Sequence, residues 1–350
     1  MNNEEVTQEI AQEKKLHGIK RFFARLNCFR EAVGKRPKVV LLILGGILAL
    51  LITLFLFVGA GEHLEYNLWL RFPTILAILL VSICVGYSTV AFQTVTNARI
   101  LTPGVLGFEN IYMFLQTLLV FIFAASTGFL FTTEGNFIIS IIVMIGFSLL
   151  IFMPLLTKGS KGVYILLLVG IILSTLFASL TAYMQLLIDP ERFMTIQALM
   201  FASFDAPDFL LMIISAGIMV AALALAPSTK KLDVISLGRE NAISLGVNHK
   251  WVCLRILIIV AALVSVSTVI AGPVMFLGLI AANLAYQFIK SYKHKYTIPA
   301  AVLICGIALV TAELFIRELF TISINVAVFI NFFGGIYFIF LLLRDRKREK

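Results

Sequence analysis

Charged side chains are scarce in this chain of 350 residues. Asp, Glu, Lys and Arg together make up 13% of it, whereas hydrophobic residues make up 60%. A soluble domain carries about twice that share of charge. The mean hydropathy of +1.01 agrees with this composition. The sequence therefore excludes an ordinary soluble protein and predicts an all-α integral membrane protein.

Motifs that bind nucleotides or metals are also missing. The sequence has no G-x-x-x-x-G-K-[ST] loop, so it does not bind ATP through a P-loop. It has no H-E-x-x-H motif and no Cys/His cluster that would hold a metal. Its four histidines lie outside the apolar runs, which excludes haem bound by pairs of intramembrane histidines. We therefore expect no cofactor and no metal site on this chain.

Ionisable residues inside the apolar runs are few. Ion-coupled carriers hold such groups deep in the membrane, and here only Glu109 and Glu313 are candidates, each near the end of a predicted helix. Proton or sodium coupling therefore has little support. No nucleophile, base or metal-ligand set indicates an enzyme. The chain lacks an energy source of its own, so a partner is expected to supply the energy. An ion-coupled secondary carrier and an assembly scaffold are the alternatives.

Ten apolar runs are long enough to be membrane-spanning helices. They cover residues 38–60, 71–96, 105–127, 137–157, 162–187, 207–227, 251–271, 274–290, 298–316 and 324–343. Together they predict one membrane domain of about ten transmembrane helices, residues 38–343. A basic N-terminal arm, 1–37, precedes it and a basic tail, 344–350, follows it. The later part of the arm, residues 17–38, is either an interfacial helix or a basic flank that only fixes orientation.

Positive charge is distributed unevenly between the two faces. If the connections are assigned to alternate sides, one side receives the N-terminal arm, residues 230–255 and the C-terminal tail. The other side receives only three arginines. The positive-inside rule then places both termini in the cytoplasm. The net charge of +9 therefore reflects topology and contact with anionic lipid, and not binding of nucleic acid.

One polar interruption, residues 228–250, separates two of the runs. It is long enough for two short helices, and each half ends in a Leu-Gly pair. Glycine adopts the left-handed backbone geometry that ends a helix and turns the chain. A structured, charged element on one membrane face predicts a docking surface for a partner. The residues expected to form it are Leu237, Gly238, Arg239, Glu240, Ala242, Leu245 and Gly246. For Arg239 and Glu240, solvation of the loop is favoured over specific contacts.

Two segments rich in Gly and Pro begin apolar runs at corresponding places in the two halves of the chain. Residues 102–107 read TPGVLG, and residues 271–278 read AGPVMFLG. Such interruptions are typical of the repeated halves of transporters. We expect them to start helices and to take part in gating. The residues concerned are Pro103, Gly107, Gly272, Pro273 and Gly278.

The three arginines of the less basic face each allow two interpretations. An arginine at a helix end can extend its side chain to the lipid headgroups. On an acidic outer face it can instead bind a carboxylate of a partner protein. The two interpretations are balanced for Arg71 and Arg317, and the first is favoured for Arg192.

Six stretches, in chain order, carry a family resemblance. They are LRFP at 70–73, NARILTPGVLG at 97–107, LLLVGIILSTLFASLTA at 166–182, DPER at 189–192, SLGRENAISLGV at 236–247 and AGPVMFLGL at 271–279. They resemble the permease subunits of bacterial ABC importers for iron-siderophore complexes and vitamin B12, the FecCD-type family. The last two stretches, separated by one predicted helix, are the most specific.

Two departures from the family pattern indicate a sub-branch. The family often continues with V-P-H-x-x-R where residues 280–286 read IAANLAY. Thr74 occupies the place of the second arginine in the family's R-x-P-R start. This sub-branch resembles the second permease of catecholate siderophore systems, such as those for petrobactin or anguibactin. In such systems two different permeases pair.

The resemblance implies a type II ABC importer whose helix bundle is like that of the vitamin B12 permease. Two permease subunits would pair around a central pathway in the bacterial cytoplasmic membrane. A substrate-binding lipoprotein would dock outside on Arg71 and Arg317, and a cytoplasmic ATPase dimer would dock on the 228–250 loop. ATP would be bound by that ATPase and not by this chain. The cargo would be a bulky ferric siderophore, with haem or cobalamin as alternative chelates.

Overall fold

The computed structural model describes residues 36–58, 64–104, 106–123, 133–152, 162–190, 193–194, 204, 209–319 and 326–346. Within these residues the regular structure is entirely helical. The helices are α2 (Pro37–Phe57), α3 (Leu64–Thr96), α4 (Phe108–Phe123), α5 (Thr133–Phe147), the π-helix η2 (Ser148–Phe152), α7 (Gly162–Leu187), α9 (Phe209–Ala224), α10 (Thr229–Ile235), α11 (Arg239–Ser244), α12 (His249–Ala271), α13 (Leu277–Phe288), α14 (His294–Leu319) and α15 (Val326–Arg346).

Local sequence signals explain several helix ends. Pro37 occupies the first turn of α2, where its missing N–H costs no hydrogen bond. The side chain of Asn248 caps α12 by accepting a hydrogen bond from the amide of Trp251 at 3.3 Å. Gly272 ends α12 with a φ of 72°, a conformation that favours glycine.

Each of the ten predicted runs coincides with one of the described helices, so the all-α prediction is confirmed. Five of these helices, α2, α3, α7, α12 and α14, are long and apolar enough to cross a membrane by themselves. α9 is long enough to cross a membrane only if α10 is counted with it, and the chain bends by 65° between these two helices. The other four are shorter apolar helices. α13, with 12 residues, is about 18 Å long, well short of the roughly 30 Å hydrocarbon core.

Three predicted boundaries differ from the observed ones. α3 begins at Leu64, not at residue 71, because Pro73 lies inside the helix and interrupts only the hydrogen bonding of one turn. α15 continues to Arg346 and so includes the start of the predicted basic tail. α5 ends at Phe147 and continues as the π-helix η2. The predicted N-terminal arm lies outside the described residues, apart from its last two.

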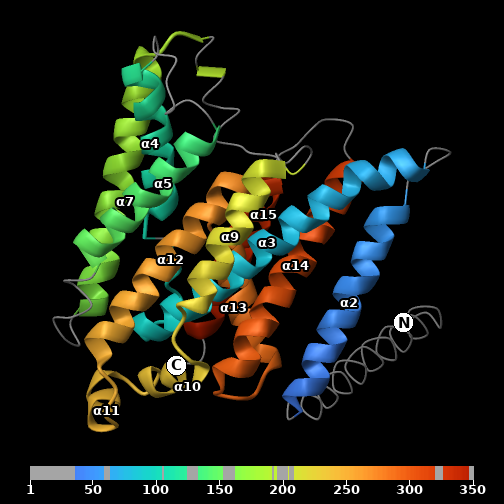
Figure 1. Ribbon diagram of the computed structural model, residues 1–350. Helices are drawn as coiled ribbons and strands as arrows, with labels where there is room; N and C mark the ends of the chain where they lie inside the picture. The colour runs from blue at the N-terminus through green and yellow to red at the C-terminus, as the bar shows by residue number, and fades with distance from the viewer. Residues whose placement is uncertain are drawn as a thin grey trace, which may run out of the picture.

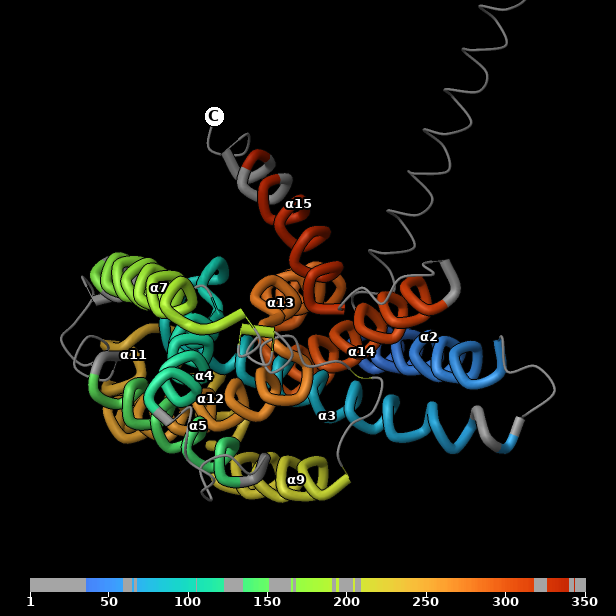
Figure 2. The backbone as a smooth tube through the Cα atoms, turned by 90° about the horizontal axis from the view of Figure 1, so that it is seen from above, coloured from blue at the N-terminus to red at the C-terminus, as the bar shows by residue number. Residues whose placement is uncertain are grey.

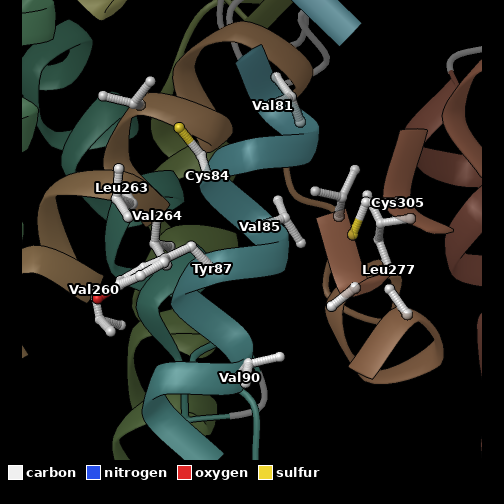
Figure 3. Close-up of a cluster of buried hydrophobic side chains, with 14 of the residues drawn as sticks. Val81, Cys84, Val85, Tyr87, Val90, Val260, Leu263, Val264, Leu277 and Cys305 are labelled. Carbon is white, nitrogen blue, oxygen red and sulfur yellow. The ribbon is translucent and has the colours of Figure 1, made fainter. Parts of the chain in front are cut away.

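α3 forms the centre of the bundle. It contacts α12 on one side and α13 and α14 on the other. Figure 3 shows Cys84 and Tyr87 of α3 directed toward α12, where Val260 and Leu263 lie, while Val85 faces α14. The contact with α14 is close, because a Cβ on Gly86 would lie 2.8 Å from the backbone of Val302.

The described helices form two groups on either side of this centre. α4, α5 and α7 lie together on one side, and α2 and α14 on the other (Figure 1). Seen from above, α15 extends away from the rest of the bundle (Figure 2). The short helices α10 and α11 lie at one end of the bundle, close to the starts of α12 and α14 and the end of α3 (Figure 1). This end is called the α10–α11 end below.

Candidate functional site

The predicted docking loop contains two short helices, as the sequence indicated. α10 covers Thr229–Ile235 and α11 covers Arg239–Ser244. Gly238 has a φ of 93° and Gly246 a φ of 79°, which confirms the expected positive-φ geometry at both Leu-Gly pairs. Apart from the glycine itself and its two neighbours in the chain, no described atom lies within 4 Å of where a Cβ on either glycine would be. These positions therefore favour glycine for its backbone conformation and not for lack of space.

The loop has one face toward the bundle and one toward solvent. Leu232, Ile235 and Ala242 are buried, and they attach the two helices to the bundle. Leu237 and Leu245 are 56% and 61% exposed. Arg239 and Glu240 are also exposed, which agrees with solvation of the loop. Large apolar side chains on an exposed, charged loop are what a protein-docking surface requires.

Sequence reasoning missed a polar network beneath this loop. Asp233 of α10 accepts two hydrogen bonds from His294, one from its amide at 2.8 Å and one from Nδ1 at 2.6 Å. The Nε2 atom of His294 lies 2.7 Å from Oγ1 of Thr94 in α3. His294 and Thr94 are each 5% exposed. The sequence carried no signal for this network, because its members are 61 and 200 residues apart.

The two Gly/Pro segments, which sequence reasoning paired only by their pattern, contact each other. A Cβ on Gly104 would lie 3.1 Å from Cα of Met275. α4 starts directly after Gly107, whose φ is 91°, and α13 starts shortly after Pro273, so the predicted helix starts are confirmed. Gly278 lies against the side chain of Thr89 in α3, where a Cβ would overlap the hydroxyl. A Cβ on Gly107 would lie 3.0 Å from Cβ of Ser174 in α7.

A buried carboxyl lies at this junction of the two segments. Glu109, in the first turn of α4, is 6% exposed and accepts a hydrogen bond from the backbone amide of Val274. Beside it is a cavity of about 20 Å³ that hydroxyl groups of Ser88, Thr89 and Ser267 help to line. A volume of this size holds about one water molecule. The cavity is therefore too small to be a pathway for a large cargo.

A second polar side chain also holds the 272–276 segment. Asn331 of α15 donates from Nδ2 to the carbonyl oxygen of Pro273 at 2.9 Å. Its Oδ1 accepts from the amide of Phe276 at 3.5 Å. One turn further along α15, Gly334 lies against Phe276. The segment that contains Gly272 and Pro273 is thus attached to α4 by Glu109 and to α15 by Asn331.

Arg71 does not have the exposed side chain that a docking residue needs. It is 5% exposed, and Nη1 donates to the carbonyl oxygens of Phe55 at 2.6 Å and Val58 at 2.5 Å. These carbonyls belong to the C-terminal end of α2. The last carbonyl groups of a helix have no hydrogen-bond partners within that helix. The guanidinium therefore caps α2, a role that neither interpretation of the sequence included.

Arg317 is more accessible than Arg71 and lies at the same end of the bundle. Its side chain is half-buried. The guanidinium carbons of Arg71 and Arg317 each lie 5.7 Å from the ring centroid of Phe55. Phe55, which sequence reasoning did not single out, joins the two arginines. Arg192 lies outside the described residues.

Within the described residues, His, Cys, Asp and Glu form no group of three that could hold a metal ion.

Comparisons with known proteins agree with the resemblance in the sequence. A model of the FecCD transport family matches residues 39–344. The chain is 42% identical to the petrobactin import system permease protein YclO of Bacillus subtilis, over 89% of this chain and 99% of that protein. It is 37% identical to the petrobactin import system permease protein FatC of Bacillus anthracis, over 79% of this chain and 78% of that one.

More distant similarities extend over most of the chain. The hemin transport system permease protein HmuU of Yersinia pestis is 24% identical over 81% of this chain and 85% of its own length. Among solved structures, a metal-chelate type ABC transporter in an inward-facing conformation has the same fold, with a TM-score of 0.75 at 21% identity. That likeness covers 88% of this chain and 99% of the other. Because the family model matches well over half of its residues, the chain belongs to the FecCD transport family.

Proposed function

We propose that this chain is the permease subunit of an ABC importer that carries a ferric siderophore of the petrobactin type across the bacterial cytoplasmic membrane. The observation that carries the proposal is the 42% identity to a petrobactin permease over 99% of that protein's length. The identity to a hemin permease is only 24%, which favours a catecholate siderophore over haem. As a member of this transport family the chain is a transport subunit and not an enzyme.

The α10–α11 end is proposed to face the cytoplasm and to receive an ATPase dimer that binds ATP. Basic residues gather there, including Lys230, Lys231, Lys293 and Lys295, all of them exposed. This distribution follows the positive-inside rule and supports a cytoplasmic position for both termini. The exposed Leu237 and Leu245 would insert into a groove of the ATPase, and the two glycines would hold them in place.

The opposite end is proposed to receive a substrate-binding lipoprotein. Arg317 is the docking cation that the structure favours, because its side chain is partly accessible while Arg71 is buried. A carboxylate on the binding protein would pair with the Arg317 guanidinium. A second permease, different from this one, would complete the pathway, with the Gly/Pro junction around Pro103, Gly107 and Gly278 as a region of gating.

Uptake in a reconstituted system tests the proposal. The chain would be assembled with its second permease and the ATPase in proteoliposomes and supplied with binding protein and radioactive ferric petrobactin. Uptake that requires ATP and the binding protein is expected. The chain alone should neither hydrolyse ATP nor transport. Transport by the lone chain, driven only by a proton or sodium gradient, would instead establish the ion-coupled carrier and reject the proposal.

The cargo requires its own test. A strain that lacks this chain should fail to grow on ferric petrobactin as its sole iron source and should recover when the chain is restored. Growth on haem or on a hydroxamate siderophore serves as the control for general iron uptake. Unimpaired growth of the deletion strain on every iron source would contradict the iron assignment, while a defect on haem alone would reassign the cargo.

A further inference from the structure

The network of Asp233, His294 and Thr94 joins three elements at one buried point. Asp233 lies on α10, His294 is the first residue of α14, and Thr94 lies in the last turn of α3. The three contacts between them measure 2.6, 2.8 and 2.7 Å. Charge-assisted hydrogen bonds of this length are the strong ones in proteins. This set is called the coupling network below.

The coupling network keeps its contacts in both protonation states of the imidazole. When His294 is neutral with its proton on Nδ1, it donates to Asp233, and the Thr94 hydroxyl donates to Nε2. When His294 is protonated, Nε2 donates to the hydroxyl, and Thr94 donates instead to the carbonyl oxygen of Val90, which lies 2.7 Å away. Rotation of one hydroxyl therefore maintains the connection.

Beyond the coupling network, α3 and α14 pack as one unit with α2. The backbones of α3 and α14 approach at Gly86 and Val302, where a Cβ would come within 2.8 Å. A Cβ on Gly306 of α14 would lie 3.2 Å from Leu48 of α2. Close backbone contacts at small residues hold membrane helices together. The three helices therefore transmit a displacement along their length better than loosely packed ones would.

The same three helices meet again at the far end of the bundle. The ring of Phe55 in α2 contacts the guanidinium groups of Arg71 on α3 and Arg317 on α14, whose central carbons each lie 5.7 Å from its centroid. A continuous unit thus extends from α10 to the end that carries Arg317. Figure 1 shows α2, α3 and α14 traversing the bundle between these two ends.

We propose that the coupling network is the connection through which movement of α10 displaces α3 and α14, and through them the opposite face of the protein. This inference rests on the proposed function, because it takes α10 as the ATPase contact. Asp233, His294 and Thr94 are positioning residues: they contact neither ATP nor cargo. Their removal should leave ATP hydrolysis in place but separate it from transport.

The test uses the complete importer in proteoliposomes and compares uptake per ATP hydrolysed. Asp233→Ala removes both bonds to His294, and Thr94→Val removes the hydroxyl at almost unchanged volume. Thr94→Ser, which keeps the hydroxyl, and Gly217→Ala in α9, where an added Cβ has open space, are the matched controls. Coupling between sites is typically worth 5–150-fold, so uptake per ATP should fall about tenfold in the first two variants. The controls should match the native importer.

A double variant and a structural readout decide between coupling and general damage. If both substitutions break one connection, Asp233→Ala with Thr94→Val should be no worse than the more impaired single variant. Hydrogen exchange gives the second readout. ATP should alter exchange at the start of α14 in the native complex and in Thr94→Ser. In Asp233→Ala it should alter exchange in α10 alone.

Three results would overturn the inference. They are native uptake per ATP in both single variants, losses that multiply in the double variant, or an unchanged exchange response of α14 in Asp233→Ala. A variant that fails to assemble leaves Thr94→Val, with its conserved volume, to decide. A native complex without ATP-dependent uptake would count against the proposed function instead, so the two failures are distinguishable.

Discussion

Replacement of Arg71 by alanine should destabilise the chain and not merely weaken docking. Its Nη1 makes short hydrogen bonds to the carbonyl oxygens of Phe55 and Val58, at 2.6 and 2.5 Å. A hydrogen bond to a charged group contributes about 1.5–3 kcal/mol. The cost of burying the guanidinium offsets part of this. We expect Arg71→Ala to lower the free energy of unfolding by about 3 kcal/mol.

Arg317→Ala is the matched control, because both guanidinium groups lie 5.7 Å from the Phe55 ring. Its side chain is more exposed, and a cation–π contact at such a site is worth about 0.5–1 kcal/mol. The assay is thermal unfolding of each purified variant in detergent, combined with titration of the importer with binding protein. Arg71→Ala should lower Tm by about 5 °C, and Arg317→Ala should mainly weaken docking. An unchanged Tm together with lost docking in Arg71→Ala would refute the capping role.

Three further substitutions test the packing, the loop and the buried carboxyl. Gly86→Ala should destabilise by about 1–3 kcal/mol in thermal unfolding, because its Cβ would meet the backbone of Val302 at 2.8 Å; Gly217→Ala in α9, with open space around it, should not. Gly238→Ala places alanine at φ 93° and ψ 164°, at a local cost of about 1–3 kcal/mol, and uptake per ATP should therefore fall. Ser244→Ala, at the end of α11, is the control. Equal uptake per ATP in the two variants would contradict a coupling role for Gly238. Glu109→Gln should keep uptake within about twofold, because its amide oxygen still accepts the Val274 bond; abolished uptake would favour ion coupling.

The sequence was sufficient to predict where the ten apolar helices lie and that the docking loop holds two short helices, although only five of the ten are long enough to cross a membrane by themselves. Apolar length defines a membrane helix, and the Leu-Gly pairs at Gly238 and Gly246 define two helix ends whatever surrounds them. Both signals are local. The predicted start of α3 at residue 71 was wrong. Pro73 interrupts the hydrogen bonding of only one turn, and the helix continues on the N-terminal side of this proline.

Helix pairing could not be predicted, because hydropathy does not separate the lipid-facing side of a helix from its core side. α2 is the more apolar of two spans, with a hydropathy of 3.1 against 2.5 for α12, yet only 22% of it is buried against 78% of α12. Lipid and protein core are equally apolar, so apolar side chains do not choose between them. The same uncertainty concealed Arg71, which the sequence placed at a helix end and the structure places inside.

Small and polar side chains supply the specificity that apolar ones lack. The 272–276 segment illustrates this, because Glu109 accepts the amide of Val274 and Asn331 bonds to Pro273 and Phe276. In an apolar surrounding, a broken hydrogen bond leaves a polar group without a partner, which costs about 1–3 kcal/mol. The segment therefore cannot shift against α4 or α15 without that cost for each lost bond. Movement of this junction during transport should displace both helices with it, so a gating role for Gly272 and Pro273 would require α4 and α15 to move as well.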